Sequence, residues 1–362
     1  MKSLRKKILT IIGTRPEIIR LSKIIPKLDK QFNNILVHTG QNYDYELDEL
    51  FFKQLKVRKP NYYLNARGSF AKQISTIIYK LEKIIEKEKP SKFLVLGDTN
   101  SSVGSIVAKR MGIKVYHMEA GNRCYSDKSP EEVNRKIIDH SSDTLLPYTS
   151  GSHQNLILEG IKKKNIVKTG NPITEVMHAN RKNISKSNIL KKLNLKKNNF
   201  FVLTIHRQEN VDNYDIFKKF VSTFNKAVSK FDKKIVWPIH PRSKKMLKKF
   251  NINLDDRVLL IKPLGFFDFV RLEKDCLLTL TDSGTVQEES AILKKPCLII
   301  REYTERPETI KAGGATLVGS NTKKILTGIN YYLNRDIKIK NIRDYMSKTV
   351  SSKIIKILKS EV

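Results

Sequence analysis

Short apolar runs alternate with longer segments of helical periodicity along almost the whole chain. In the first half, the runs of strand length are Ile8–Ile12, Ile35–His38, Phe93–Leu96, Val115–Met118 and Thr144–Leu146. Apolar positions with helical spacing fall between them, as in Tyr45–Leu55 and Gln73–Lys87. Nearly continuous apolar strands separated by helices are typical of a parallel sheet covered on both faces. The pattern therefore predicts an α/β fold.

The second half of the chain repeats this pattern. Its apolar runs of strand length are Phe200–Ile205, Lys234–Pro238, Val258–Ile261, Leu277–Thr281 and Cys297–Ile300. The stretch from Asn180 to Asn199 is rich in Lys, Asn and Ser and has little apolar content outside Ile189–Leu195, which indicates a domain boundary. We expect two Rossmann-like, doubly wound domains that face each other across a cleft, with ligands at the carboxyl ends of the strands. A length of 362 residues suits two such domains.

No segment of the sequence has the pattern of a membrane anchor or a secretion signal. No apolar run approaches the roughly 20 residues that a bilayer span requires. The apolar run Ile8–Ile12 follows a basic start but ends at Gly13, so it is too short for the core of a signal peptide. We therefore expect a cytoplasmic protein that does not contact a membrane.

The chain is strongly basic, with 69 Lys and Arg against 36 Asp and Glu and a formal net charge of +33. Nucleic-acid binding is one explanation, but it requires basic residues that cluster on one face. Here the excess is spread thinly, mostly as Lys beside Asn and Ile. We therefore expect a small polyanionic ligand as the partner and no nucleic acid.

The chain has three cysteines, which are Cys124, Cys276 and Cys297. They are widely spaced and form no C-x-x-C pair, so neither a disulfide framework nor a zinc knuckle is indicated. Cys276 and Cys297 lie in apolar runs and are predicted to be small core residues.

The first candidate site follows the first predicted strand. No G-x-G-x-x-G occurs there and no G-x-x-x-x-G-K-[ST] occurs anywhere in the chain, which disfavours the usual NAD and ATP enzymes. The strand is followed instead by Gly13-Thr14-Arg15-Pro16-Glu17. Gly13 permits a tight turn, Pro16 suits the first turn of a helix, and Arg15 is placed to bind an anionic ligand. The alternative is a plain strand-to-helix turn with a solvated arginine.

The second candidate site is the segment Leu280-Thr281-Asp282-Ser283-Gly284-Thr285, which precedes a predicted helix from Val286. Small residues with exposed N–H groups at a helix N-terminus form a phosphate site. Ser283, Gly284 and Thr285 are the candidates, and Glu289, one to two turns further on, is placed to accept hydrogen bonds from a ribose diol. The alternative is that Asp282 or Ser283 acts only as a helix cap.

Carboxylates form the third candidate set. Asp98 and Glu119 each follow a predicted strand, and Glu131 opens a helix that carries Arg135 one turn on. Carboxylates that face a bound anion would have raised pKa values suited to proton transfer. Taken singly, Asp98 could be a helix cap and Glu131 a partner of the helix dipole.

Two histidines end strands of the second half. His206 ends the first strand and His240 ends the next, which places both at the predicted cleft. His206 could act as an acid or base, or could polarise a phosphate. No third ligand lies at zinc-like spacing and H-E-x-x-H is missing, so we predict no metal site.

These motifs, in this order, resemble those of the non-hydrolysing UDP-N-acetylglucosamine 2-epimerase family. The resemblance covers most of the chain, and its remaining motifs are Gly97-Asp98-Thr99, Glu119-Ala120-Gly121, Pro130-Glu131-Glu132-Val133-Asn134-Arg135, Thr169-Gly170-Asn171, His206-Arg207, Ser283-Gly284 and Thr304-Glu305-Arg306-Pro307-Glu308. It implies a glycosyltransferase-B-like fold without metal, NAD or another cofactor, and a homodimer. It also implies that a last helix, around Val350–Leu358, returns to the first domain. The expected domains are therefore residues 1–175 with 345–362, and residues 176–344.

The resemblance also implies a mechanism and assigns residues to it. A base removes the C2 proton of the sugar while UDP leaves C1, and UDP adds back after C2 is reprotonated on the other face. Asp98, Glu119 and Glu131 would handle the proton, and His206 and Arg15 would stabilise the diphosphate. The nucleotide would be bound by Ser283, Gly284, Thr285, Glu289 and Phe269, the last beside the uracil, and Arg135, His240 and Arg306 complete the expected binding residues.

Some motifs depart from the family pattern. A common Gln-His after the second strand is Gln41-Asn42 here, the usual Glu-Ala-Gly-Leu-Arg-Thr ends as Asn122-Arg123-Cys124, and a common Lys is Arg20. These changes resemble the branch that epimerises modified UDP sugars, such as precursors of UDP-N-acetyl-L-fucosamine or diacetamido-uronates. They also put an effector site in doubt. A glycosyltransferase with the same fold stays open as an alternative activity.

Overall fold

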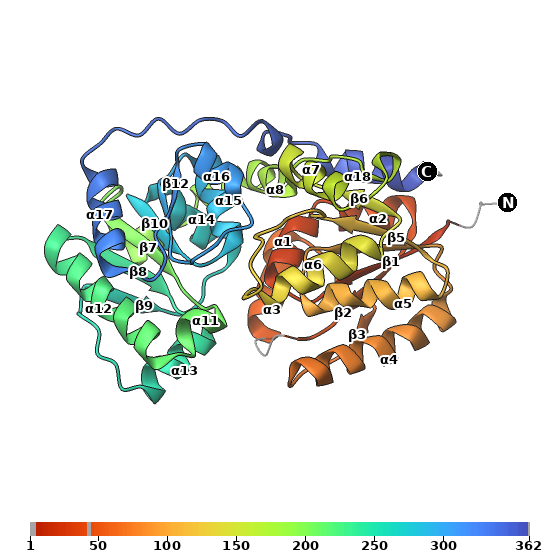
Figure 1. Cartoon of the computed structure of the whole chain (residues 1–362), viewed down its shortest axis with the longest axis horizontal. Coiled ribbons are helices and arrows are strands. Elements are labelled where there is room, and N and C mark those ends of the chain that lie inside the picture. Colours follow the sequence, from red (N-terminus) through yellow and green to blue (C-terminus); the bar gives the residue numbers. More distant parts are fainter. Residues whose placement is uncertain (1–4, 42–44, 361–362) are drawn as a thin grey trace. The chain divides into compact units, whose positions relative to one another are not determined.

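The structure, a computed structural model, describes residues 5–41 and 45–360. The chain forms two compact units, residues 1–179 with 343–362 and residues 180–342. These limits lie a few residues from the expected boundaries. Each unit is an α/β domain built on a six-stranded parallel sheet (Figure 1). Asn42, which is one of the departures from the family pattern, lies outside the described residues.

The sheet of the first unit has the strand order β3-β2-β1-β4-β5-β6. Its strands are β1 (Lys7–Ile12), β2 (Asn33–His38), β3 (Tyr62–Tyr63), β4 (Lys92–Leu96), β5 (Lys114–Met118) and β6 (Thr144–Leu146). Its helices are α1 (Arg15–Leu21), α2 (Ile25–Gln31), α3 (Tyr45–Leu55), α4 (Phe70–Glu88), α5 (Ser105–Arg110), α6 (Pro130–His140), α7 (Ser150–Leu158), α8 (Pro172–Ala179) and α18 (Val350–Lys359), with 3₁₀ turns at Asn100–Gly104, Lys163–Asn165 and Arg343–Tyr345. In Figure 1, α4, α5 and α6 lie on one side of this sheet and α2, α8 and α18 on the other.

The sheet of the second unit has the order β12-β11-β10-β7-β8-β9. Its strands are β7 (Phe200–Thr204), β8 (Lys234–Pro238), β9 (Val258–Ile261), β10 (Leu278–Thr281), β11 (Cys297–Ile299) and β12 (Ala315–Leu317). Its helices are α9 (Arg181–Ser185), α10 (Ile189–Lys192), α11 (Gln208–Val211), α12 (Tyr214–Phe231), α13 (Pro241–Lys249), α14 (Phe266–Asp275), α15 (Gly284–Leu293), α16 (Pro307–Lys311) and α17 (Thr322–Leu333). Both sheets therefore have the Rossmann order, in which the chain reverses direction across the sheet between the first and fourth strands.

Helix α4 illustrates how the local sequence determines an element. Ser69 caps its first turn by accepting a hydrogen bond from the Lys72 N–H. Ile77, Leu81 and Ile84 recur at helical spacing and are buried against the first sheet, as the 3.6-residue period requires. The helix ends at Glu88 and is capped by Lys89, whose backbone is left-handed (φ 50°).

The predicted strands are confirmed, and two further strands occur at sheet edges. β3 and β12 have two and three residues and expose part of their side chains. They carry no continuous apolar run, because an edge strand needs less apolar surface than a central one. The stretch predicted as the boundary is not a free linker, since α9 and α10 within it pack against α14 of the second unit.

Helix α18 belongs to the first unit, as the resemblance implied. Its Ser351 N–H donates to Glu175 of α8 at 2.8 Å, and Lys27 of α2 donates to the Ser351 hydroxyl at 2.7 Å. Cys276 and Cys297 are buried core residues, also as predicted. In the described segments, no helix combines the length and apolar character needed to cross a bilayer.

Candidate functional site

The predicted site residues of the first unit gather where β1, β4 and β5 end. β4 pairs with both β1 and β5, so their carboxyl ends are adjacent. Arg15 follows β1 as the first residue of α1, Asp98 follows β4, and Glu119 follows β5. The reversal in strand order between β1 and β4 is where Rossmann-like sheets bind ligands.

Glu17 ties the β1 and β4 loops together. Its carboxylate accepts hydrogen bonds from the N–H groups of Gly13 and Thr14 and, at 2.7 Å, from the Thr99 hydroxyl. The side chain is buried, and burial raises the pKa of Glu17 to about 7 in spite of these donors. Glu17 was quoted in the first motif but was not predicted to have this role.

This raised pKa predicts a pH-dependent contribution to stability. A carboxyl group that binds its proton more tightly when folded stabilises the fold fully below its ordinary pKa of 4.5 and loses that contribution as the pH rises through about 7. We expect the free energy of unfolding of the wild type, relative to Glu17→Gln, to fall by about 2–3 kcal/mol between about pH 5 and pH 8. Urea unfolding at both pH values measures this difference. The exposed Glu86 supplies the control Glu86→Gln, and a pH-independent difference for Glu17→Gln would contradict the prediction.

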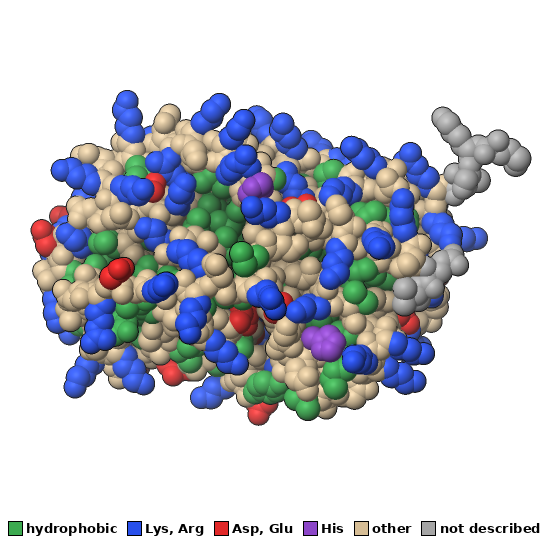
Figure 2. All heavy atoms as spheres, turned by 90° about the horizontal axis from the view of Figure 1, so that it is seen from above, with side chains coloured by type: hydrophobic (Ala, Val, Ile, Leu, Met, Phe, Trp, Pro, Cys, Tyr) green, Lys and Arg blue, Asp and Glu red, His purple; other side chains and the backbone are tan. Residues whose placement is uncertain are grey.

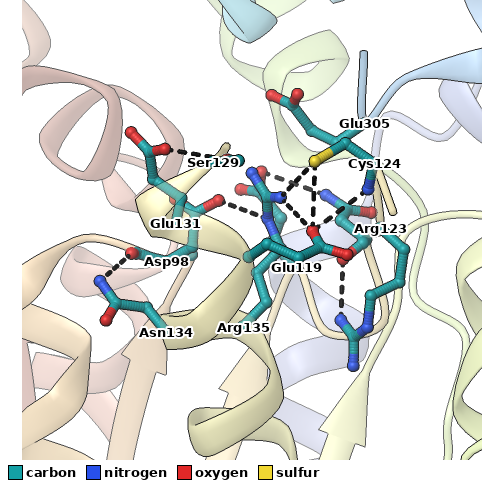
Figure 3. Close-up of polar contacts among 12 residues, drawn as sticks. Asp98, Glu119, Arg123, Cys124, Ser129, Glu131, Asn134, Arg135 and Glu305 are labelled. Atoms are coloured by element: carbon teal, nitrogen blue, oxygen red, sulfur yellow. Dashed lines mark hydrogen bonds and ion pairs between the residues drawn. The ribbon is translucent and has the colours of Figure 1, made fainter. Parts of the chain in front are cut away.

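Asp98 forms an ion pair with Arg135. The Asp98 Oδ2 lies 2.7 Å from Arg135 Nε, and Asn134 donates to the Asp98 backbone carbonyl at 2.9 Å. Figure 3 shows these side chains reaching from α6 toward the end of β4. Asp98 keeps a quarter of its side-chain surface exposed. It does not cap the 3₁₀ turn that follows, whose capping position is Thr99.

Glu119 forms a second, more deeply buried ion pair. Its Oε2 lies 2.6 Å from Arg20 Nη1, and both side chains are only 5% exposed. The backbone of Glu119 is left-handed, with φ 69°, a conformation that costs a residue with a Cβ about 1–2 kcal/mol. A Cβ added at Gly97 would lie 3.8 Å from Glu119 Oε2, so this carboxylate lies beside the β4 loop that carries Asp98.

A buried network holds the loop that follows Glu119. Asp139 of α6 accepts hydrogen bonds from the His117 ring and the Gly121 N–H and pairs with Arg123 at 2.8 Å. The other ring nitrogen of His117 lies 3.0 Å from the Gly97 carbonyl. His117, which is not among the predicted site residues, links the loops that present Asp98 and Glu119.

Glu131 completes the carboxylate set from the first turn of α6. It is half-buried and accepts a hydrogen bond from the Ser129 hydroxyl at 3.1 Å. Arg135, one turn along the same helix, pairs with Asp98 at 2.7 Å and with Glu132 at 2.6 Å. Although burial opposes its ionisation, the Cys124 N–H and Arg135 keep the pKa of Glu132 below its ordinary value. The structure thus brings all three predicted carboxylates to one edge of the first sheet.

In the second unit, Asp282 organises the ends of β7 and β10. Its Oδ2 accepts hydrogen bonds from the N–H groups of His206 and Arg207 at 2.9 Å each, and its Oδ1 lies 3.3 Å from His206 Nδ1. The side chain therefore does not act only as a helix cap. It orients His206, a role that sequence reasoning missed, although its position at a strand end was a signal.

His206 and His240 come together as expected. Their ring centroids are 5.3 Å apart. His240 also caps α13 by accepting a hydrogen bond from the Arg242 N–H at 3.2 Å.

The N-terminus of α15 presents the predicted phosphate residues. Ser283 occupies the capping position without a capping hydrogen bond from its side chain, and its hydroxyl lies 3.0 Å from that of Thr285. Only glycine fits at position 284, because an added Cβ would lie 2.5 Å from a carboxylate oxygen of Glu305. That carboxylate is buried and held by Arg301 at 3.0 Å.

The remaining predicted residues of this unit are buried or half-buried. Arg306 forms a buried ion pair with Glu288. Phe269 is half-buried and packs against a core cluster that includes Phe200 and Leu272. Glu289 lies in α15 and is 4% exposed.

The described residues contain no cluster of three or more His, Cys, Asp or Glu side chains arranged to hold a metal ion. Over the face drawn in Figure 2, Lys and Arg side chains are scattered rather than gathered into one stripe.

Comparisons with known proteins agree with this geometry. Residues 26–359 match the family described as UDP-N-acetylglucosamine 2-epimerase. A UDP-N-acetylglucosamine 2-epimerase of Methanococcus maripaludis is 41% identical, covering 90% of this chain and 92% of that one. A UDP-2,3-diacetamido-2,3-dideoxy-D-glucuronate 2-epimerase of Pseudomonas aeruginosa is 34% identical, covering 92% and 94%.

A solved structure extends the similarity to the fold. The Methanocaldococcus jannaschii UDP-GlcNAc 2-epimerase, in complex with UDP-GlcNAc and UDP, has a TM-score of 0.93 at 39% identity and covers 97% of this chain and 99% of its own. The resemblance found in the motifs is therefore confirmed over almost the full length. The chain belongs to the UDP-N-acetylglucosamine 2-epimerase family.

Proposed function

We propose that this enzyme interconverts UDP-N-acetylglucosamine and UDP-N-acetylmannosamine by elimination and re-addition of UDP. The observation that carries the proposal is the set of carboxylates at one sheet edge, Asp98, Glu119 and Glu131. Buried arginines pair with Asp98 and Glu119, and the Ser129 hydroxyl donates to Glu131. Proton abstraction next to a sugar's anomeric carbon needs a positioned carboxylate base and an anchored leaving group. The first unit supplies the carboxylates, and the second supplies the anion site.

In the proposed reaction, a carboxylate removes the proton from C2. The electron pair of the C–H bond forms a C1=C2 double bond, and the bond between C1 and the phosphate oxygen breaks to release UDP. A second group then acts as an acid and returns a proton to C2 from the opposite face, and a UDP oxygen adds back to C1. The sugar thus changes configuration at C2 without net oxidation or hydrolysis.

Further predicted residues are assigned to the UDP group. His206, oriented by Asp282, and Arg15 stabilise the charge that develops as UDP leaves. Ser283, Gly284 and Thr285 bind phosphate at the N-terminus of α15, where the helix dipole favours negative charge. Glu289 binds the ribose diol, Phe269 lies beside the uracil, and Arg135, His240 and Arg306 complete the binding residues. The homodimer and the cytoplasmic location stay predictions.

The test is a proton NMR time course with UDP-N-acetylglucosamine in D₂O. We expect deuterium to appear at C2 together with a growing signal of the manno epimer, because the proton returned to C2 comes from a group that exchanges with solvent. Folded enzyme that binds UDP but exchanges no C2 proton would contradict this choice of substrate.

A modified UDP sugar is the second candidate substrate. It is favoured by Arg20 and the other departures from the family pattern, and by the similarity to the diacetamido-glucuronate epimerase. The higher identity to the Methanococcus maripaludis UDP-N-acetylglucosamine enzyme supports the first candidate instead. The same NMR experiment with 6-deoxy and uronate UDP sugars separates them, and failure of every epimerisation would favour glycosyl transfer.

A further inference from the structure

The second unit contains a pair of buried carboxyl groups that the proposed mechanism uses only in part. Glu273 lies in the last turn of α14, and Glu289 lies in α15, which packs against α14. Glu273 is 0% exposed and Glu289 is 4% exposed. Glu289 is the predicted ribose ligand, whereas Glu273 has no assigned role.

Glu273 has no conventional partner for a buried negative charge. Within the described parts of the chain, neither of its carboxyl oxygens receives a hydrogen bond from an N–H or O–H group of another residue. The neighbouring titratable groups are Glu289, the thiol of Cys276 at the end of α14 and the thiol of Cys297 in β11. The nearby Lys295 ammonium donates elsewhere, to the Cys276 carbonyl and to Asn198. Two negative charges buried side by side here would be strongly unfavourable.

A proton on Glu273 removes this difficulty. The pKa of Glu273 is raised well above its ordinary value, mainly by burial and further by the negative charge of Glu289. The protonated carboxyl has an O–H donor, and the group within its hydrogen-bonding reach is the Glu289 carboxylate. The two carboxyls then share one proton, as closely paired acids do.

We propose that Glu273 is a positioning residue whose protonated carboxyl donates a hydrogen bond to Glu289 and fixes the orientation of that carboxylate toward the nucleotide ribose. The inference rests on the proposed function, in which Glu289 accepts hydrogen bonds from the ribose hydroxyls. A carboxylate has about four acceptor sites, so one bond from Glu273 leaves acceptors for the diol. If the Glu289 carboxylate is already held in place, less conformational entropy is lost when the nucleotide binds.

The test compares the affinities for UDP and for 2′-deoxy-UDP in Glu273→Leu and Glu273→Gln. Leucine removes the donor, so we expect the preference for UDP over 2′-deoxy-UDP to fall about tenfold, the size of one hydrogen bond to a charged group. Glutamine keeps a neutral N–H donor and should retain most of the preference. With the full substrate, Glu273→Leu should raise KM and leave kcat almost unchanged, since ribose binding is equal in the ground and transition states.

Thermal unfolding separates positioning from a structural role. Glu273→Leu removes one partner of the pair and leaves the buried Glu289 carboxylate without this donor, so its melting temperature should fall together with the ribose preference. Glu273→Gln keeps a donor and should retain most of both. A Leu variant that keeps the wild-type preference overturns the proposal. Equal losses of preference in the Leu and Gln variants, with parallel losses of stability, overturn it as well.

A measurement on the wild type does not depend on the folding of any variant. We expect the infrared carbonyl band of a protonated carboxylic acid at about pH 8, and we expect Glu273→Gln to lack it. Absence of this band from the wild type overturns the proposal. Glu289→Ala checks the underlying function, because wild-type UDP affinity in that variant would remove Glu289 from the nucleotide site and the role of Glu273 with it.

Discussion

Replacing Asp98 by Asn is expected to lower the rate of C2 epimerisation about 10²–10⁴-fold, the usual contribution of a general acid or base. Asparagine has nearly the same shape but cannot take up or release the proton. The affinity for UDP should stay close to that of the wild type, because the predicted phosphate and ribose ligands Ser283, Gly284, Thr285 and Glu289 lie in the second unit. The rate is measured by NMR and the affinity by calorimetry.

The structure makes this variant a clean probe. Arg135, which pairs with Asp98, also pairs with Glu132 at 2.6 Å. The substitution Asp98→Asn therefore does not leave a buried guanidinium without a carboxylate, and the stability of the variant should fall by no more than about 1–2 kcal/mol. The exposed Asp336 supplies the control Asp336→Asn, which should retain full activity. Unchanged turnover in Asp98→Asn would rule out a catalytic role for Asp98.

Glu119→Gln is expected to lose both activity and stability. The substitution removes the negative charge from a buried ion pair with Arg20, and breaking such a pair typically costs about 3 kcal/mol or more. It also removes a proton-handling carboxylate, so turnover should fall about 10²–10⁴-fold. Chemical unfolding and the NMR assay measure the two losses separately.

A double variant distinguishes catalysis from folding at this position. Arg20→Met together with Glu119→Gln removes the buried charge as well as its partner, so most of the lost stability should return. Activity should not return, because the carboxylate is still missing. Recovery of turnover along with stability would show that Glu119 is only structural. Glu88→Gln, in the more exposed pair with Lys7, is the matched control and should cost less than about 1 kcal/mol.

The fold was largely predictable from the sequence because its signals are local. The central strands are buried on both faces and therefore appear as apolar runs, as in Phe93–Leu96 and Phe200–Leu203. The edge strand β3 has two residues and a partly exposed surface, so no apolar run marks it. Helices α9 and α10 were not predicted for a similar reason. They lie in a polar stretch, and their packing against α14 involves only a few apolar side chains.

The candidate site was predictable in its positions but not in its pairings. Asp98, Glu119, His206 and Ser283 were identified because polar residues after buried strands meet at one edge of each sheet. Their partners carry no such signal. Glu17 lies within a motif that indicates only a turn, Asp282 has the position of a helix cap, and no motif contains Glu273.

The sequence by itself determined the order of elements, the two α/β domains, the family and the strand ends at which the candidate site residues lie. These properties follow from periodicity and motifs that extend over a few residues each. Only the tertiary structure decided which charges pair and which carboxyl must keep a proton. Arg20 and Glu119 are 99 residues apart, and His206 and Asp282 are 76 apart. Such contacts depend on how strands are ordered in a sheet and on burial from water, which determines the cost of each charge.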